Sequence, residues 1–343
     1  MYCPNHTGTI PTSLGTCTNL TSFSVAETYG TLYGGIPSEL AQLKNLTHLD
    51  LGGNRINGTN LASLGQLKNL QVLNLSHNLI SGKIPDEIFE TTNLRHLYLQ
   101  HNRITGTIPR SIESCEELVE LRVSDNTLNG TIPSSLPRKL QVIRFDRNDF
   151  TGHLPGESIR NMSNLVEFHA DRNRFEGDVH NTFSNALSLE IINLAHNKLN
   201  GSVRSVTHSS SKMLLTTYHR MLRHNIIEQV PMLRNLKNLT QIILRDNEFD
   251  RVQSNSFAGD ESLIFLDLSK QQSSSLVLET HSFANIPSST NLIFTGSSIP
   301  VISSNAFQSR ENTNLDLSAL SIHTLAPYAF NGAFFVLLER TFL

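Results

Sequence analysis

Hydrophobic and polar residues recur along this chain in an order that is neither helical nor strictly alternating. In residues 93–109 (NLRHLYLQHNRITGTIP), fixed residues stand at positions 0, 3, 5, 8, 10 and 12, namely Leu94, Leu97, Leu99, Asn102, Ile104 and Gly106. Leu97 and Leu99 are two residues apart and therefore point to the same side of a short strand. A single strand cannot bury that side, so the pattern predicts strands that stack on one another.

The same pattern recurs over most of the chain. Its copies are 22 to 25 residues long in the best-preserved part and begin at Leu46, Leu70, Leu94, Leu118, Leu140, Leu165 and Leu189. A stretched copy begins at Leu20, and later copies begin at Leu239 and Leu263, followed by weaker ones near Ser289 and Asn312. Stacking of such copies predicts a parallel sheet over a continuous leucine core.

Two polar columns belong to the turn after each predicted strand. Position 8 holds an asparagine, whose amide can pair with the backbone groups that the turn leaves unpaired. We expect a structural asparagine ladder formed by Asn54, Asn78, Asn102, Asn126, Asn148, Asn173 and Asn197. Position 12 holds a glycine, which supplies backbone angles that side chains forbid. Ile-Pro often follows, and a later apolar column predicts short helical or 3-10 return stretches such as DEIFETTN.

The copies from Leu20 to Leu189 resemble the plant-specific leucine-rich repeat, LxxLxLxxNxLxGxIP; NLQVLNLSHNLISGKIP is a close match. This resemblance covers residues ~8–203. Residues ~217–343 are similar to typical leucine-rich repeats, because they lack Gly and Ile-Pro and instead carry Val252 and Phe257. The resemblance implies an α/β solenoid, a curved horseshoe or superhelix. Its parallel sheet lines the concave face, and short helices, 3-10 turns and loops form the convex face.

We expect one continuous solenoid with three parts: plant-type repeats over 1–203, a Ser-rich irregular junction over 204–216, and typical-type, partly degenerate repeats over 217–343. Both ends begin or stop within a repeat, which indicates a fragment of a longer protein. The resemblance to receptor-like kinase and receptor-like protein ectodomains implies that a transmembrane helix, and perhaps a kinase domain, lies in the missing part.

Composition and residue positions limit the classes of partner and binding site that this chain can have. A net charge of −3 does not favour a nucleic-acid partner, and the late apolar stretch AFFVLL is too short to span a membrane. Cys17 and Cys115 both occupy a column three residues before the first leucine, so we expect two small core hydrophobes. His77, His101 and His196 share position 7, where no carboxylate or cysteine joins them in the frame. We therefore expect no metal site and no cofactor; a pH-sensitive surface and plain solvated histidines are the alternatives.

Sequons carry the main indication of compartment. Besides the sequon at Asn5, N-x-S/T occurs at Asn19, Asn45, Asn57, Asn74, Asn129, Asn161, Asn200 and Asn238. The repeat consensus itself generates NLT and NGT, so a cytoplasmic location stays an alternative. Many sequons together with few cysteines favour an extracellular or cell-surface protein.

The positions that the core does not dictate are 2, 4, 6 and 7. In the central copies they carry charges of both signs, which suits peptide or protein ligands. We expect a binding site on the concave face at Tyr98, Arg122, Arg144, Arg147, His169 and Arg172. The alternative is a solvated face without a ligand.

The resemblance implies a non-catalytic receptor module that recognises a peptide, protein or glycan, with a co-receptor as a possible partner. The sequence shows no nucleophile–base pair, phosphate-binding loop or metal-ligand spacing in a frame that would converge. The alternative function is an extracellular adhesion or structural scaffold protein without a discrete ligand.

Overall fold

The computed structural model describes residues 7–26 and 32–178 and parts of the rest of the chain: 182–183, 188–189, 191–200, 220–221, 241–245, 247–257, 263–271, 275–284, 286–287, 290–308, 313–317, 322, 324–331 and 333–337. The chain folds into two compact units, residues 1–173 (unit 1) and 174–343 (unit 2). Asn238 and the expected junction at 204–216 lie outside the described residues, so the predicted boundary there stays a prediction.

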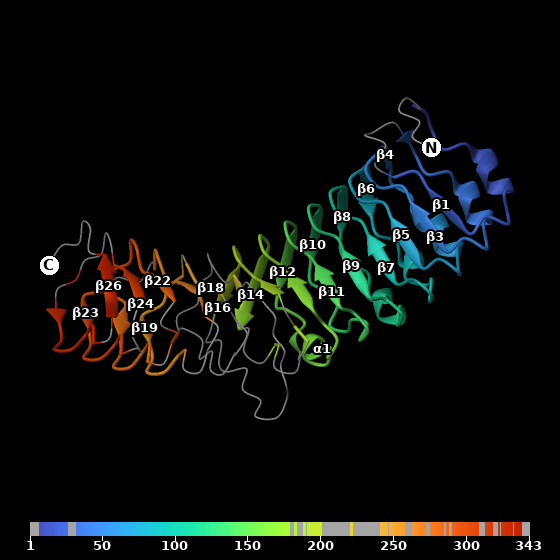
Figure 1. The fold of residues 1–343 in the computed structure, drawn as a ribbon. Coiled ribbons are helices and arrows are strands. Elements are labelled where there is room, and N and C mark those ends of the chain that lie inside the picture. Colours follow the sequence, from blue (N-terminus) through green and yellow to red (C-terminus); the bar gives the residue numbers. More distant parts are fainter. Residues whose placement is uncertain are drawn as a thin grey trace. The chain divides into compact units, whose positions relative to one another are not determined.

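Unit 1 is a solenoid in which each turn contributes one short strand to a long parallel sheet (Figure 1). The strands of this sheet are β1 Ser22–Ser24, β3 His48–Asp50, β5 Val72–Asn74, β7 His96–Tyr98, β9 Glu120–Arg122, β11 Val142–Arg144 and β13 Glu167–His169. Leu97 pairs with Leu73 on one side and with Leu121 on the other. Equivalent repeat positions therefore lie side by side, and the apolar columns form a buried core from Leu46 onward, whereas Leu20 in the first copy is half-buried. The solenoid expected from the repeat pattern is confirmed.

A second parallel sheet follows the turn at positions 6 to 8 of each repeat. Its strands in unit 1 are β2 Tyr33–Gly34, β4 Arg55–Gly58, β6 Leu79–Lys83, β8 Arg103–Gly106, β10 Thr127–Gly130 and β12 Asp149–Gly152. The glycine at position 12 is the last or next-to-last residue of each of the longer strands and has a positive φ, for example 78° at Gly106 and 72° at Gly130. Only glycine adopts these angles without strain, which explains the column.

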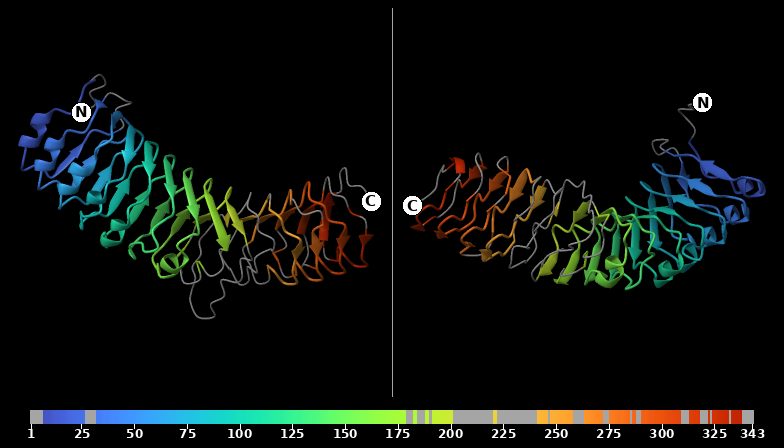
Figure 2. Two further views of the ribbon diagram at one scale, coloured as in Figure 1. Left: turned by 180° about the vertical axis from the view of Figure 1, so that it is seen from behind. Right: turned by 60° about the horizontal axis from the view of Figure 1, so that its bottom comes forward.

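The chain then returns through short helical stretches, as the apolar column predicts (Figure 2). These are the 3-10 turns η1 Thr12–Thr16, η2 Ser38–Gln42, η3 Ala62–Gln66, η4 Asp86–Ile88 and η5 Arg110–Ser114, and the α-helix α1 Gly156–Arg160. They stack closely because small residues separate them. A Cβ on Gly65 of η3 would lie 2.2 Å from the carbonyl oxygen of Glu87 in η4.

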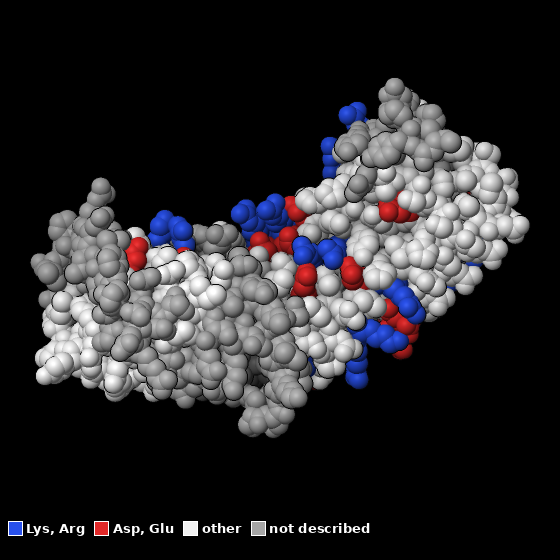
Figure 3. Space-filling view, in the orientation of Figure 1, with Lys and Arg blue, Asp and Glu red and all other residues white. Residues whose placement is uncertain are grey.

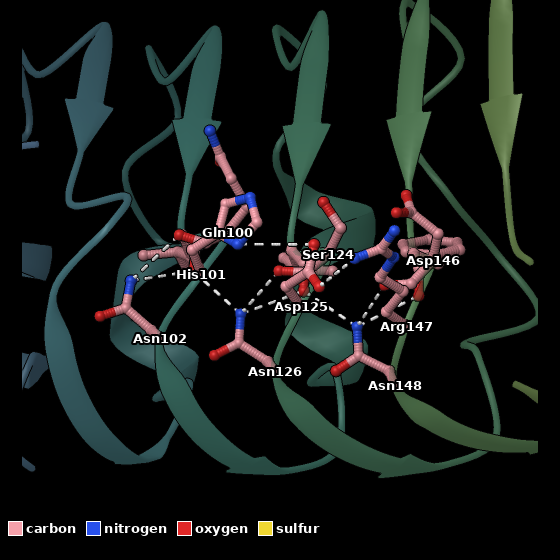
Figure 4. Close-up of polar contacts among 12 residues, drawn as sticks. Gln100, His101, Asn102, Ser124, Asp125, Asn126, Asp146, Arg147 and Asn148 are labelled. Atoms are coloured by element: carbon pink, nitrogen blue, oxygen red, sulfur yellow. Dashed lines mark hydrogen bonds and ion pairs between the residues drawn. The ribbon is translucent and has the colours of Figure 1, made fainter. Parts of the chain in front are cut away.

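The asparagines of the predicted ladder are hydrogen-bonded between repeats, and all are buried except the half-buried Asn102 (Figure 4). The side-chain amide of Asn126 donates to the carbonyls of Val123 and Ser124 in its own repeat and of Leu99 in the preceding repeat. Its Oδ1 accepts a hydrogen bond from the N–H of Ile104 in the preceding repeat. The same Oδ1 contact is made by Asn54, Asn78, Asn102, Asn148 and Asn173 in unit 1 and by Asn197 in unit 2.

Unit 2 contains the same kinds of strand. One group comprises β15 Ile191–Asn193, β17 Arg220–Met221, β18 Gln241–Ile243, β20 Phe265–Asp267, β22 Asn291–Ile293, β24 Thr313–Asp316 and β26 Ala333–Leu337. In the second sheet, β14 Arg174–Asp178 pairs with β16 Lys198–Asn200. A separate four-stranded parallel sheet contains β19 Arg251–Val252, β21 Val277–Leu278, β23 Val301–Ile302 and β25 Thr324–Leu325.

Stacked phenylalanines replace leucine contacts in the return stretches of unit 2. Phe257 stacks on Phe283 with ring centroids 5.7 Å apart, and Phe283 stacks on Phe307 at 5.2 Å. Phe330 continues the stack beyond Phe307 at 5.7 Å. This row of rings is the packing that the apolar column of the later repeats predicts.

The prediction for Cys17 is wrong. Cys115 is buried and burial raises its pKa to about 12, as expected for a core thiol. Cys17 is exposed, because it lies in the first described turn and no described repeat packs over it.

Within the described residues, no helix is both long enough and apolar enough to cross a bilayer.

Candidate ligand-binding face of unit 1

The strands β7, β9, β11 and β13 each turn one apolar side chain inward and two side chains outward, which gives a half-buried, buried, half-buried pattern. The inward residues are Leu97, Leu121, Ile143 and Phe168. We call the outward side chains at positions 2, 4 and 6 of these four repeats the sheet face. Figure 3 shows Lys and Arg side chains interleaved with Asp and Glu side chains around β9 and β11. The sheet face is therefore mixed in charge, as the sequence predicts.

Tyr98 and Arg122 meet around one carboxylate. The Tyr98 hydroxyl donates to Oε2 of Glu120 over 2.9 Å, and the Nε of Arg122 donates to the same oxygen over 3.1 Å. The guanidinium carbon of Arg122 lies 5.6 Å from the centre of the Tyr98 ring. Burial, and next the hydrogen bond to Glu120, raise the pKa of Tyr98 to about 12. The phenol therefore stays protonated, and these contacts hold both expected anchors in one orientation.

Arg144 and His169 meet around a second carboxylate. The guanidinium of Arg144 donates to Oε2 of Glu167 over 2.8 Å, and Nε2 of His169 lies 3.8 Å from the same oxygen. Burial, and next the positive charge of Arg144, lower the pKa of His169 to about 4. His169 is therefore neutral at physiological pH.

Asp146 lies beside this pair at position 6. Burial, and next the charge of Asp171 on the neighbouring repeat, raise the pKa of Asp146 to about 6. Arg144 Nε, Asp146 Oδ1 and His169 Nε2 are fully enclosed and have no hydrogen-bond partner among the described residues. Three polar atoms that lack partners thus lie on two adjacent repeats, where a bound group could pair with them.

Arg147 and Arg172 do not lie on the strands of the sheet, where the sequence predicts them. Position 7 lies in the turn after the strand and has a left-handed backbone, with φ between 52° and 55° at His77, His101, Asp125, Arg147 and Arg172. Figure 4 shows His101, Asp125 and Arg147 of this position in a row along the end of the strands. The His77 and His101 rings stack at 4.2 Å, and Asp125 pairs with His101 at 3.5 Å and with Arg147 at 3.3 Å.

This row corrects the expectation that no carboxylate joins the histidines, because the position-7 residue of the next repeat is Asp125. Arg147 is paired with Asp125, and Arg172 lies 4.0 Å from Oδ2 of Asp171. The structure thus brings Tyr98 and Arg122 together, and Arg144 and His169 together. It places the two position-7 arginines on the adjoining row.

The sequons differ in exposure. Asn57, Asn129 and Asn200 are exposed at the second sheet, on β4, β10 and β16. Asn74 is half-buried on β5, and its Oδ1 accepts hydrogen bonds from the backbone N–H and the hydroxyl of Ser76. Three further sequon asparagines are exposed, of which Asn45 and Asn161 donate to backbone carbonyls; the third is Asn19.

Two repeat families match the sequence. The family described as Leucine Rich Repeat matches residues 45–67 and 69–90, and Leucine Rich repeats (2 copies) matches residues 92–138. The chain is a leucine-rich repeat protein. Among curated proteins, osteomodulin from Bos taurus is 31% identical over 106 residues, which is 31% of this chain and 24% of osteomodulin.

Solved structures with this fold include receptor ectodomains. One is a plant peptide hormone receptor, RGFR1, in complex with RGF2, with a TM-score of 0.66, 23% identity and coverage of 98% of this chain and 61% of that one. Another is the ectodomain of the Arabidopsis receptor kinase HAESA with an IDA peptide hormone ligand, with a TM-score of 0.68, 23% identity and coverage of 95% and 64%. A plant ice-binding protein has a TM-score of 0.55, 25% identity and coverage of 70% and 80%.

This leucine-rich repeat chain spans about a quarter of osteomodulin and about three fifths of each receptor chain. At these identities the likeness to the two receptor structures establishes the fold. In the HAESA structure the solenoid is the ectodomain of the receptor kinase. The ice-binding protein shows that the fold also serves other purposes, so a function must be argued from the residues of the sheet face.

Proposed function

We propose that this leucine-rich repeat protein is a non-catalytic recognition module that binds a peptide or a protein segment on the sheet face of unit 1. The observation that carries the proposal is the cluster of Tyr98, Arg122 and Arg144 with their carboxylates on consecutive strands. Arginine and tyrosine are favoured anchors of interfaces, and intramolecular contacts that fix their rotamers lower the entropy lost on binding.

Charge complementarity favours a ligand with groups of both signs. The sheet face offers Arg122 and Arg144 beside Glu120, Glu167 and Asp146, so a polyanion would meet repulsion from the carboxylates. A peptide can present carboxylates to the arginines and amide N–H groups to the acidic side chains. The receptor structures with bound peptide hormones support this choice of ligand class.

We also place the protein outside the cell or at its surface, as part of a receptor. The exposed sequon asparagines on β4 and β10 support this location, as do the receptor ectodomains among the structures with this fold. A membrane anchor and a co-receptor belong to the same proposal. A scaffold without a discrete ligand is the competing function, and the ice-binding protein favours keeping it as a second candidate.

The test uses a phage-displayed random peptide library selected on the purified wild-type chain. Peptides that it enriches are measured against Arg122→Ala/Arg144→Ala, for which we expect a loss of ~2 kcal/mol, or about 30-fold in Kd. The matched control is Arg110→Ala/Arg138→Ala, which removes two exposed arginines outside the sheet face, one of them in η5. Equal losses in both variants, or no enriched peptide at all, would contradict the proposal and favour the scaffold.

A further inference from the structure

We propose that Asp146, His169 and Asp171 form a binding site for a first-row divalent cation, with Zn²⁺ as the best match. One ligand atom from each residue can be chosen so that all three lie within 4.8 Å of one another. A single point then lies within about 2.8 Å of all three atoms (4.8 Å divided by √3). Zn–N and Zn–O bonds are ~2.0–2.2 Å long, so each donor would move inward by ~0.8 Å or less.

The repeat architecture brings these three residues together. Arg144 of β11 pairs in register with His169 of β13, which sets position 6 of one repeat beside position 6 of the next. The N–H of Arg147 donates to the carbonyl of Asp171 over 2.8 Å, so the backbone pairing continues past the strand ends. His169 and Asp171 are two residues apart on an extended backbone and point to the same side. Rigid backbone therefore supplies the ligands from two neighbouring repeats.

Two polar atoms of the cluster are available to a bound cation. Asp146 Oδ1 and His169 Nε2 are enclosed and have no hydrogen-bond partner among the described residues. Asp146 and Asp171 offer carboxylate oxygens within 4.8 Å of each other, so their like charges repel. A divalent cation would pair with all three groups and offset that repulsion.

Among the described contacts, neither Arg144 nor Arg172 joins all three donor residues. The guanidinium of Arg144 is bonded to Glu167 at 2.8 Å, and Arg172 Nε lies 4.0 Å from Oδ2 of Asp171. Their positive charges weaken cation binding, so we expect a moderate affinity rather than that of a structural zinc finger. With three protein ligands, the fourth position of a tetrahedral ion would be open to water or to a ligand group.

The donor set selects among cations. One imidazole nitrogen with two carboxylates suits Zn²⁺ and its first-row neighbours, whereas Ca²⁺ takes six to eight oxygen ligands and Mg²⁺ keeps most of its water. The site shares Asp146 with the peptide-binding function proposed above, but its test measures cation binding without a peptide, so the two proposals can fail independently. It uses none of the anchors Tyr98, Arg122 or Arg144.

The test is isothermal titration of the untagged full chain with ZnCl₂, and with CaCl₂ as the selectivity control. We expect one saturable Zn²⁺ site, at least a tenfold loss of affinity in Asp146→Asn, His169→Gln and Asp171→Asn, and no saturable Ca²⁺ binding at this site. Replacement of Zn²⁺ by Co²⁺ should give a visible absorption band in the wild-type chain that these variants lose.

The control variant is His101→Gln/Asp125→Asn, which removes a different histidine–carboxylate pair of unit 1, 3.5 Å apart. This control matters because the chain has 14 histidines that can bind Zn²⁺ loosely. Thermal unfolding in EDTA shows whether each variant is folded before titration. Unchanged affinity in the three site variants, a loss only in the control variant, or absence of saturable Zn²⁺ binding would overturn the proposal.

Discussion

Replacing Asn126 by alanine tests the principle that holds the repeats together. Asn126 lies in the middle of unit 1 with only 9% of its surface exposed, so fraying of an end cannot explain a loss of stability. Alanine removes the oxygen that accepts the Ile104 N–H over 2.9 Å. Ile104 is buried, so its N–H would lose this acceptor where water cannot replace it. That loss alone costs ~1–3 kcal/mol.

The three carbonyls that Asn126 serves lose less, because each keeps a second donor. Leu99 O still accepts from Asn102, Val123 O from Asn148, and Ser124 O from the backbone N–H of His101. Each carbonyl therefore loses a bond without becoming unpaired, at a few tenths of a kcal/mol to about 1 kcal/mol. Together with the small cavity, the expected destabilisation is ~2–4 kcal/mol.

The assay is urea unfolding of the full chain. The chain has no tryptophan, so circular dichroism is the suitable signal. Asn129→Ala is the matched control: it removes the same side chain from the same repeat at an exposed position, and should shift the free energy of unfolding by no more than ~0.5 kcal/mol. If Asn126→Ala were no less stable than Asn129→Ala, the hydrogen-bonded ladder would not be what joins neighbouring repeats.

Three further predictions follow from local geometry. Gly65→Ala should destabilise unit 1 strongly in thermal unfolding, because the new Cβ would meet the Glu87 carbonyl at 2.2 Å, while Gly8→Ala, with nothing within 4 Å, should not. Folding raises the pKa of Asp146 from 3.8 to about 6, so wild-type stability falls as pH rises through 6. Asp146→Asn lacks this penalty, so urea unfolding above pH 6 should show it to be more stable than wild type by up to ~2 kcal/mol. The difference should shrink toward pH 4. After secretion from eukaryotic cells, mass spectrometry should find more glycan at exposed Asn57 than at half-buried Asn74, and similar occupancy at both would contradict the difference in exposure.

The repeat period predicted the fold because every fixed residue serves the core or the turn. Position 3 is buried at Leu97 and Leu121, and position 8 carries the asparagine contacts. Cys17 shows the limit of column reasoning, because burial needs a repeat packed on both sides. Gln271 shows another limit: it stands at an asparagine position, and its longer amide still donates to the carbonyls of Leu244, Leu268 and Ser269.

The candidate site was predictable in its residue types but not in its pairings. The offset rule placed Arg122 and Arg144 on adjacent strands. Alternation within β9 brings Arg122 to Glu120, and the register of β11 with β13 brings Arg144 to Glu167. Position 7 was taken for strand, although its left-handed backbone at Arg147 is a property of the turn. Asp146 and Asp171 share position 6, a signal that comparison of neighbouring columns would have found.

The central claim is that the sheet face of unit 1 recognises a charged ligand, and a charge swap tests it most directly. The double variant Arg144→Glu/Glu167→Arg exchanges two side chains that are 2.8 Å apart, so the ion pair remains while both charges change place. We expect unfolding stability within ~1 kcal/mol of wild type, because the pair is re-formed. Affinity for the selected peptides should fall at least tenfold, or ~1.4 kcal/mol, because the ligand meets reversed charges. Unchanged affinity in a variant that is folded would contradict the account.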